Sequence, residues 1–576
     1  MKKRKKIYFI LVLVIALVLG IKYMSSLYDV KIVPGMTTMV RANEWNSLIS
    51  DKVNEEKISV YVDGKMTEVD KSDIFMNDDM EVMINCRLLT PLFSCAVNRQ
   101  YTSTVIIEKA DKQLIITAGA DIVVSGGKEI SVKSKAQIVD GEIFIPASYI
   151  STFLSYQFEW DYRNLSAEFT NQKPDEKIYP YYYSYRDSNK ISRVKNQKDL
   201  GTCWAFASLT ALESTMMPEN HEDFSEDHMS CHNGYNLDQN QGGTYNMSMA
   251  YLASWMGPVR ESDDPYGDGI SPDGLEAAYH VQEMQIISSK NFDGIKKAVF
   301  LYGGVQSSLY MSLSDSYGNS SAAYNADTSA YCYIGTEKAN HDVVIIGWDD
   351  GYPASNFATQ PEGDGAFICM NSWGEEFGEK GYFYVSYYDS NIGVRNLVYT
   401  KVENTDNYDN IYQTDKCGWI GQLGYNREYA YFSNIYEAEG DETLEAVGFY
   451  ATGENTEYEV YFVNNFEDTS SFADKELIAK GSFSNAGYYT VKTDKEILLM
   501  SGSKYAVIVY ISTPNSVLPI AIEYRADSST STVDISDGEG YISLHGSIWE
   551  RVEETQNCNV CLKMYTKDYI EGEDEQ

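Results

Sequence analysis

The stretch Val194-Lys-Asn-Gln-Lys-Asp-Leu-Gly-Thr-Cys-Trp-Ala-Phe-Ala207 places a cysteine at the start of an apolar run. Cys203 opens a segment, residues 203–217, whose apolar residues predict a helix. The positive end of a helix dipole stabilises negative charge, which favours the nucleophilic thiolate. Such a thiol also needs a base that completes an ion pair and protonates the leaving group. The stretch therefore predicts a catalytic Cys203 with a base elsewhere in the chain.

Two later motifs supply partners for this thiol. His341 lies in Ala339-Asn-His-Asp-Val343, 138 residues after the cysteine. Asn371 begins Asn371-Ser-Trp-Gly374, 168 residues after it. An imidazole is the usual acid and base for a cysteine nucleophile, and an amide oxygen can orient it.

In this order the three motifs resemble those of the papain-like cysteine peptidases, over about residues 178–400. In that family the histidine and asparagine follow the cysteine by about 130–150 residues. The polar stretch 349–364 reads as an inserted loop that accounts for the longer spacing. The resemblance implies peptidase activity without a cofactor and an α+β fold with a helical half and a β half, in agreement with helical patterns before about residue 300 and strand patterns after it. Lesser matches are Phe224-Ser-Glu226, Gly242-Gly243 and Asp264-Pro-Tyr266.

The resemblance also implies roles for individual residues. Cys203 is expected to be the nucleophile and His341 the general acid and base. Asn371 is expected to hold the imidazole in its orientation. Gln197, six residues before the cysteine, is expected to stabilise the oxyanion together with the backbone N–H of Cys203.

Further residues are expected to border the peptide substrate. Gly242 and Gly243 would bring backbone close enough to pair with an extended peptide, and Trp373 would cover the contact between histidine and asparagine. Asp342 stands where the family usually has a small residue, next to the pocket for the second residue before the scissile bond. We hypothesise that its carboxylate favours Arg or Lys there. The alternative, in which Asp342 bonds to its own scaffold, stays open.

The chain departs from the family pattern at three points. Leu200 replaces a family cysteine, and Asn240 stands at the place of that cysteine's usual partner, so one family disulfide is absent. Cys231 matches another family cysteine but has no clear partner. No inhibitory helical pro-segment is recognisable.

Residues 25–171 are expected to form a β-rich stalk or adaptor module, followed by a linker at 172–180 and the peptidase domain at 181–405. The module resembles one at the amino end of some copper amine oxidases, on the patterns Arg87-Leu-Leu-Thr-Pro91, Ile143-Phe-Ile-Pro-Ala147 and Phe158-Glu-Trp-Asp161. That module is not the copper-binding part, so the resemblance implies no metal.

Residues 410–568 alternate apolar and polar in short runs and predict a β-sandwich, with an acidic tail at 569–576. This segment resembles the lectin-like domain that follows papain-like domains in some bacterial secreted proteins. Exposed aromatic residues such as Trp549 could stack on a glycan, or could pair across strands in the core. The domain is a candidate binder of glycan or surface protein.

The first 24 residues predict export. Five of the first six residues are basic, and Ile7 to Ile21 carries no charge. Such a segment is a signal peptide or an uncleaved membrane anchor. We favour the anchor, which would place the catalytic domain outside the cell membrane; secretion after cleavage is the alternative.

Composition excludes several classes of protein. The 576 residues carry a net charge of −38, which repels the phosphates of nucleic acids. Nine cysteines are too few for a disulfide scaffold. The grouped residues His221, His228, Cys231 and His232, and the pair Cys558 and Cys561, lack a second matching zinc motif, so we predict no metal site.

Together these features predict an exported or surface-anchored bacterial cysteine endopeptidase that acts on peptides or proteins. A non-catalytic adhesin built on the same fold is the rival interpretation. A transpeptidase on this fold would share the acyl-enzyme and is a third.

Overall fold

The computed structural model describes residues 58–67, 69–77, 80–110, 112–161, 164–174, 176–313 and 320–569. The predicted signal segment, the start of the predicted adaptor module and nearly all of the acidic tail lie outside these residues. The chain divides into two units, Met1–Pro180 and Tyr181–Gln576. Among the described residues, every helix is too short or too polar to span a lipid bilayer.

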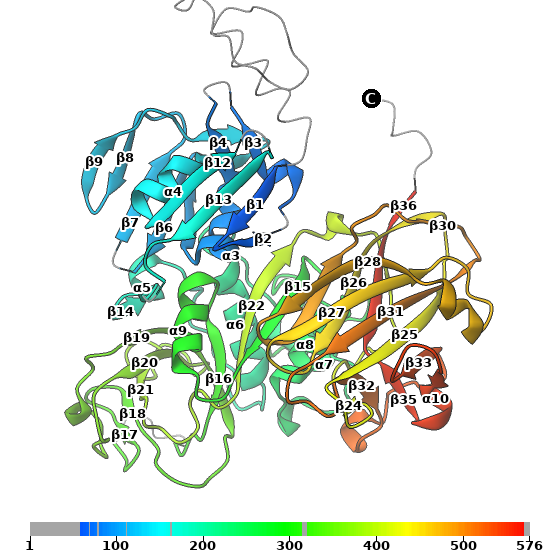
Figure 1. Ribbon diagram of the computed structural model, residues 1–576. Coiled ribbons are helices and arrows are strands. Elements are labelled where there is room, and N and C mark those ends of the chain that lie inside the picture. Colours follow the sequence, from blue (N-terminus) through cyan, green and yellow to red (C-terminus); the bar gives the residue numbers. More distant parts are fainter. Residues whose placement is uncertain are drawn as a thin grey trace, which may run out of the picture. The chain divides into compact units, whose positions relative to one another are not determined.

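The first unit is β-rich, as predicted, and contains three small sheets (Figure 1). Its core is aliphatic, with Phe93 and Phe169 in contact at 5.0 Å between ring centroids. The sheet orders are β12-β13-β1-β2, β10-β11-β4-β3 and β5-β6-β7-β8-β9. The elements are β1 (Ser59–Val62), β2 (Lys65–Thr67), β3 (Ile74–Met76), β4 (Val82–Asn85), α3 (Leu89–Phe93), β5 (Ala96–Tyr101), β6 (Thr104–Lys109), β7 (Lys112–Thr117), β8 (Ile122–Ser125), β9 (Lys128–Ser131), β10 (Gln137–Val139), β11 (Glu142–Pro146), α4 (Ala147–Phe153), β12 (Tyr156–Asp161) and β13 (Ser166–Asn171).

A buried helix, α6 (Cys203–Met216), lies between the helical half and the β half of the peptidase part of the second unit. Its residues are apolar or small on nearly every face, which is the pattern of a helix surrounded by other elements. It packs on α7 (Glu226–Cys231) and α8 (Tyr245–Ala253) on one side, and on strands of the β half on the other. The predicted helical half is therefore present, and α6 joins it to the sheet.

The strands of the β half pair mostly antiparallel, with β18 (Ala330–Tyr331) and β21 (Tyr382–Ser386) as a parallel pair. Here β16 (Val305–Leu309) and β20 (Ala366–Met370) flank β19 (His341–Asp349), while β21 pairs with β20 and β22 (Asn396–Glu403) pairs with β16. The remaining elements are β14 (Tyr182–Ser184), α5 (Tyr185–Ser188) and β17 (Tyr324–Asn325).

The C-terminal part forms the predicted β-sandwich. One sheet has the order β28-β27-β31-β25-β33-β34, and it packs on the layer β29-β26-β36-β23 through a core that includes Phe432, Phe449 and Val509. The elements are β23 (Asn410–Tyr412), β24 (Gly421–Leu423), β25 (Tyr429–Glu437), β26 (Glu442–Ala451), β27 (Thr456–Val463), β28 (Glu476–Phe483), β29 (Ala486–Lys492), β30 (Leu498–Leu499), β31 (Lys504–Ser512), β32 (Ile520–Tyr524), β33 (Gly540–Ser543), β34 (Glu550–Arg551), α10 (Val552–Thr555), β35 (Cys558–Val560) and β36 (Leu562–Asp568).

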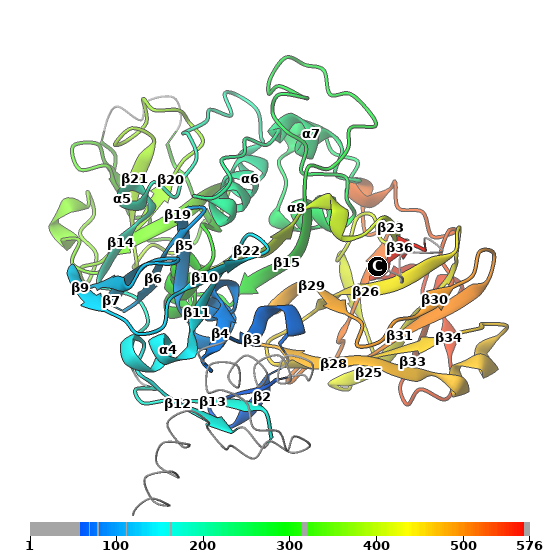
Figure 2. The same cartoon turned by 90° about the horizontal axis from the view of Figure 1, so that it is seen from above.

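Two strands, β14 and β15 (His280–Ile287), come before residue 300 and so depart from the predicted order of helices first and strands second. Helix α9 (Phe292–Leu301) keeps to that order but packs on strands of the β half. The segment β15 contains Gln282, Glu283 and Gln285, so apolar alternation is weak there. This strand pairs with β22 on one side and with β29 on the other, so that one sheet runs from the peptidase part into the sandwich (Figures 1 and 2).

Candidate active site

Cys203 is the first residue of α6, as predicted. Thr202 precedes it without capping the helix, because its hydroxyl lies 2.7 Å from the hydroxyl of Tyr266. The backbone N–H groups of Cys203, Trp204 and Asp342 face the thiol. Since Asp342 directly follows His341, the thiol lies beside the start of β19.

Burial sets the protonation of the two reacting groups. Together with the Asp342 carboxylate, it raises the pKa of the Cys203 thiol to about 12, against the opposing effect of the backbone N–H groups. Burial lowers the pKa of His341 to about 4, against the hydrogen bond with Asn371. The backbone N–H groups at the helix start lower the pKa of the thiol, as predicted, but burial raises it by more. The ion pair must therefore form by transfer of the thiol proton to the imidazole, where the two charges compensate each other.

His341 and Asn371 are brought together by neighbouring strands. His341 begins β19, and Asn371 directly follows β20. Nε2 of the imidazole donates to Oδ1 of Asn371 at 2.7 Å. The ring of Trp373 lies over the imidazole, with 4.9 Å between centroids. This is the arrangement predicted for these three residues.

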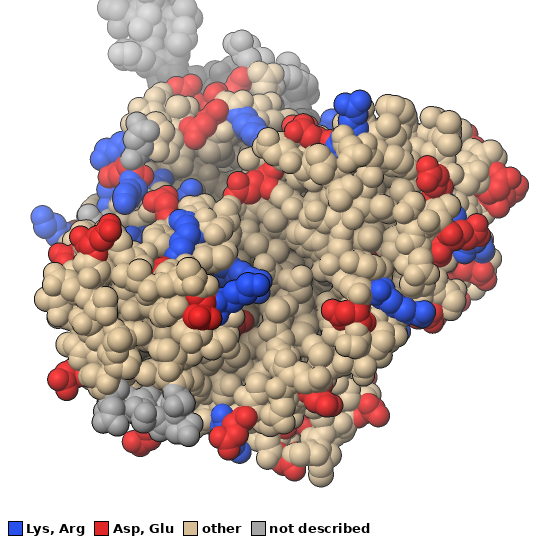
Figure 3. All heavy atoms as spheres, turned by 90° about the horizontal axis from the view of Figure 1, so that it is seen from below, with Lys and Arg blue, Asp and Glu red and all other residues tan. Residues whose placement is uncertain are grey.

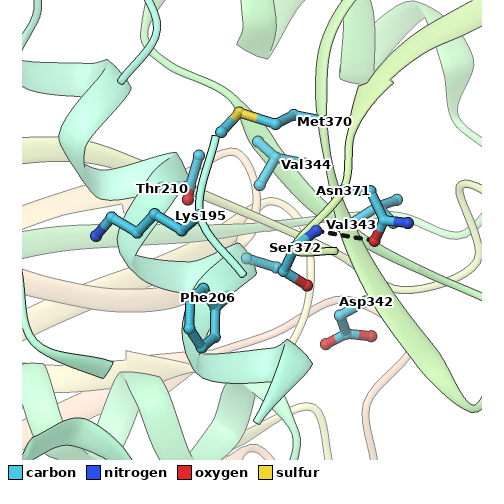
Figure 4. Close-up of a pocket in the computed structure, with 10 residues that line it drawn as sticks. Lys195, Phe206, Thr210, Asp342, Val343, Val344, Met370, Asn371 and Ser372 are labelled. Carbon is cyan, nitrogen blue, oxygen red and sulfur yellow. Dashed lines mark hydrogen bonds between the residues drawn. The ribbon is translucent and has the colours of Figure 1, made fainter. Parts of the chain in front are cut away.

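A small pocket lies behind these groups, where α6 meets β19 and β20 (Figure 4). Phe206 and Thr210 line it from the helix, and Asn371 and Ser372 line it from the loop after β20. Asp342 also borders this pocket. Helix α6, which carries Cys203, and strand β19, which carries His341, therefore meet in a contact that contains both polar and apolar side chains.

The side chain of Gln197 is held in one orientation. Its Nε2 donates to the backbone oxygen of Leu200 at 2.8 Å, and its Oε1 accepts from Ser372 Oγ at 2.6 Å. The backbone N–H of Gln197 donates to the oxygen of Ser372 at 2.8 Å. A carboxamide NH2 has two donors, so the second N–H is available to an oxyanion.

The Gly242-Gly243 pair follows a short 3-10 turn, Gln239–Gln241. A Cβ on Gly243 would lie 2.4 Å from the ring of Trp204, so the backbone here packs directly on the residue after the nucleophile. Gly242 has φ of 78°, and a Cβ there would meet nothing within 4 Å. A Cβ on Gly201 would lie 2.9 Å from the oxygen of Gln239. Close backbone packing thus joins the two segments near Leu200 and Asn240, where the family has a disulfide.

Asp342 has partners in its own scaffold. Its Oδ2 accepts from Gln306 Nε2 at 2.8 Å, and Ser308 also hydrogen-bonds to the carboxylate. Burial raises the pKa of this carboxyl, whereas these bonds and the charge of Arg395 lower it. A buried carboxylate with such partners does not require a substrate cation. The contacts therefore favour the scaffold alternative over a preference for Arg or Lys.

The other cysteines and histidines have ordinary contacts. All nine cysteines lie in the described residues and none forms a disulfide; Cys231 is exposed, and Cys558 and Cys561 are buried. His228 is hydrogen-bonded to Tyr251 at 2.7 Å and stacks on His232 at 4.4 Å. The described residues contain no group of three or more His, Cys, Asp or Glu side chains with the geometry of a metal site.

Two residues of the site were missed at the sequence level. Tyr266, quoted only as part of a lesser match, donates to the backbone oxygen of Gln197 at 2.8 Å and so holds the loop before the nucleophile. Lys195 lies in the same loop and is buried among carboxylates. Each contact joins segments far apart in the sequence, so no local pattern could have indicated it.

Comparison with known proteins agrees with this geometry. A family model described as papain family cysteine protease matches residues 179–402. This segment is a papain-family cysteine protease domain. Models described as lectin-like domain and copper amine oxidase N-terminal domain match residues 411–566 and 61–167. The predicted resemblances and the predicted fold class are confirmed.

Individual relatives are similar at moderate identity. The probable cysteine protease RD19B of Arabidopsis thaliana is 26% identical over 247 residues, which cover 39% of this chain and 63% of the relative. Mouse pro-cathepsin H is 26% identical over 243 residues, 40% of this chain and 68% of the relative. The chain thus spans less than two thirds of the first relative's length.

Two solved structures cover the protease and sandwich together. The clostridial cysteine protease Cwp84 after propeptide cleavage is 27% identical, with a TM-score of 0.59, over 67% of this chain and 99% of that chain. The cysteine protease and lectin-like domains of Cwp84, a surface layer associated protein of Clostridium difficile, are 26% identical, with a TM-score of 0.57, over 68% and 89%. The order of protease domain and lectin-like domain is therefore shared with Cwp84.

Charged side chains of both signs are mixed on the face of the protein shown in Figure 3. On this face, basic side chains lie next to acidic ones instead of forming one patch.

Trp549 is half-buried and packs on Phe472, with 4.2 Å between ring centroids. Its contacts fit the core interpretation of this aromatic residue better than a role in stacking on sugars.

Proposed function

We propose that this protein is a cysteine endopeptidase that hydrolyses peptide bonds through an acyl-enzyme. The proposal rests above all on one arrangement. The thiol at the start of α6 lies beside the residue that follows His341, and the His341 imidazole is bonded to Asn371 beneath the ring of Trp373. A binding scaffold has no need for such an arrangement.

In the acylation step, the proton of Cys203 passes to His341 and the sulfur attacks the peptide carbonyl. The oxyanion is stabilised by the free N–H of Gln197 and the backbone N–H of Cys203. When the intermediate collapses, the C–N bond breaks and the imidazolium gives its proton to the leaving amine. Asn371 keeps the imidazole in place throughout.

In the deacylation step, His341 takes a proton from water, which attacks the thioester carbonyl. The C–S bond breaks, the carboxylic acid leaves, and the thiol is restored. Gly242, Gly243 and Trp373 are the residues expected to contact the extended substrate, with Asp342 bordering the pocket for the second residue before the scissile bond.

We place the protein outside the cell, on a bacterial surface or secreted. The charge pattern of residues 1–24 supports export, and Cwp84, which shares the domain order, is described as surface layer associated. The substrate is a peptide or protein. The lectin-like domain is a candidate site for a glycan or a surface protein.

The test is covalent labelling of the thiol. The chain without residues 1–24 and its Cys203→Ala variant are treated with an epoxysuccinyl peptide under reducing conditions, and the intact proteins are weighed. One adduct on the wild type and none on the variant is expected. A folded wild type that takes no adduct contradicts the proposal and favours the adhesin. Cleavage of a reporter peptide, with and without an added amine acceptor, then separates hydrolysis from transfer.

A further inference from the structure

A buried glutamine bonds to the residues that follow the nucleophile and the base. Gln306 lies on β16 and is 1% exposed. Its Nε2 donates to the backbone oxygen of Trp204 at 3.2 Å and to Oδ2 of Asp342 at 2.8 Å. Trp204 directly follows Cys203, and Asp342 directly follows His341. One amide therefore joins α6 to β19 one residue away from each reacting side chain.

The orientation of this amide is itself fixed. Ser208 donates to Oε1 of Gln306 at 2.6 Å, and its hydroxyl lies 2.6 Å from that of Ser248 on α8. Ser208 and Ser248 are fully buried. The carboxamide thus uses both N–H groups and its oxygen in one network. A fully satisfied buried network of this kind has a single low-energy arrangement.

Such a network specifies a geometry that apolar packing alone leaves loose. The neighbouring contact between α6 and β19 includes Phe206, Val343 and Val344, whose van der Waals contacts have no direction. Two hydrogen bonds from one planar amide fix both the separation and the register of the two elements. The chemistry needs this precision, since a misplacement of about 1 Å can lower a rate by about 100-fold.

We propose that Gln306 is a positioning residue that clamps the helix of Cys203 to the strand of His341, with the carboxylate of Asp342 as its acceptor. The inference rests on the proposed function, because a clamp on these two residues serves a nucleophile and its base. It also gives the carboxylate of Asp342 a partner within the scaffold of the site, in place of a preference for Arg or Lys in the substrate.

The charge of Asp342 has a separate, measurable effect. The ionisable groups that face it are Cys203 from α6, Tyr245 from α8 and Arg395 from the segment before β22, and it adjoins His341 on its own strand. Tyr266 also faces the thiol. The Asp342 carboxylate raises the pKa of Cys203. An asparagine at this position keeps an oxygen acceptor for Gln306 and removes the charge.

The test is the rate at which iodoacetamide alkylates Cys203 between pH 4 and pH 10, followed by peptide mass mapping in the full chain. Exposed Cys231 is the internal reference for a thiol without a catalytic base; burial and the carboxylate of Asp227 raise its pKa. The variants are Gln306→Leu and Asp342→Asn. Gln282→Leu is the matched control, because Gln282 is also a buried strand glutamine and its side-chain amide has no hydrogen-bond partner among the described residues.

The clamp predicts a different profile for each variant. In Gln306→Leu, alkylation of Cys203 at pH 6 falls by about 10-fold to 100-fold, and its pH profile approaches that of Cys231. In Asp342→Asn, the thiol stays reactive and its rate rises at lower pH than in the wild type, because the carboxylate charge is gone. The control Gln282→Leu keeps the wild-type profile.

Three outcomes would contradict the clamp. A folded Gln306→Leu protein with the wild-type profile overturns the clamp while leaving the proposed function intact. If the alkylation rate of Cys203 in the wild type has the same pH profile as that of Cys231, both the proposed function and the clamp are overturned. If Gln306→Leu does not fold, Ser208→Ala takes its place; it frees only Oε1 of the amide, and a smaller fall in the same direction is expected. A Ser208→Ala profile equal to that of the wild type counts against the clamp.

Discussion

At the scale of single residues, Lys195 shows how the loop before the nucleophile is anchored. Its ammonium lies 2.9 Å from Glu213, 2.7 Å from Asp223 and 2.8 Å from Glu226, and it is buried. Burial raises the pKa of Glu226 to about 8, although the lysine charge opposes this shift. The backbone oxygen of Lys195 accepts from the N–H of Gly374 at 3.0 Å. The cluster thus connects the Gln197 loop to the segment that follows Asn371.

We predict that Lys195→Met lowers the free energy of unfolding by about 3–5 kcal/mol, because it leaves buried carboxylates without their cation. Arg193→Met is the matched control. Arg193 bonds to the same Asp223 at 2.8 Å, but its side chain is 66% exposed, so a loss below about 1 kcal/mol is expected. Denaturant unfolding of the two variants measures both values. Equal losses would show that the cluster adds nothing beyond a surface ion pair.

Gln197 carries the second prediction at this scale. Gln197→Ala removes an oxyanion donor, so kcat on a reporter peptide is expected to fall by about 100-fold to 1,000-fold with a small change in KM. Ser372→Ala keeps that donor and removes only the hydrogen bond to Oε1. Its effect on kcat is expected to be clearly smaller. A kcat for Gln197→Ala close to that of the wild type would remove this side chain from the oxyanion site.

At the scale of elements, Gly243 packs tightly on the start of α6. Because a Cβ on Gly243 would lie 2.4 Å from the Trp204 ring, Gly243→Ala must push the helix start aside. We predict a loss of about 1–3 kcal/mol in stability together with reduced alkylation of Cys203. Gly242→Ala is the comparison, since it meets no atom but holds φ of 78° and ψ of −168°. It is expected to cost about 1–3 kcal/mol through backbone strain while leaving Cys203 as reactive as in the wild type.

The elements also show what the sequence could predict. Helix α6 and strands β19 and β20 were predictable because each has a strong local pattern of apolar residues. The catalytic candidates lie at the ends of these elements, and their roles were predicted from the resemblance of the motifs to those of the papain-like peptidases. Strand β15 was not predictable, because it buries Gln282 among its apolar residues. The contacts of Gln306 could not be predicted from the sequence either, because each of its partners comes from a different part of the chain.

At the scale of the whole second unit, the protease domain and the sandwich share a sheet. Strand β15 is paired on both sides, and the sandwich supplies one of its partners through β29. The sandwich also contacts the segment that leads to the Gly242-Gly243 pair. The N–H of Asn236 donates to the oxygen of Ser529 at 2.7 Å, and the Tyr235 hydroxyl donates to the oxygen of Cys417 at 2.9 Å. The lectin-like domain is therefore part of the structural support of the protease domain.

Because the two domains share a sheet, we predict that they unfold together. We also predict that this coupling depends on Gly487, which lies where β29 pairs with β15. Gly487 pairs with Gln285 at φ of 150°, and a Cβ there would lie 2.0 Å from the oxygen of Met284. Gly487→Val should therefore break the β15–β29 pairing and expose an edge strand. Gly440→Ala is the control, because its Cβ would meet only the Glu442 side chain, at 3.5 Å or more. Calorimetry is expected to show one transition for this unit in the wild type and in Gly440→Ala, and two in Gly487→Val. A single transition in a folded Gly487→Val protein would mean that side-chain contacts alone couple the domains.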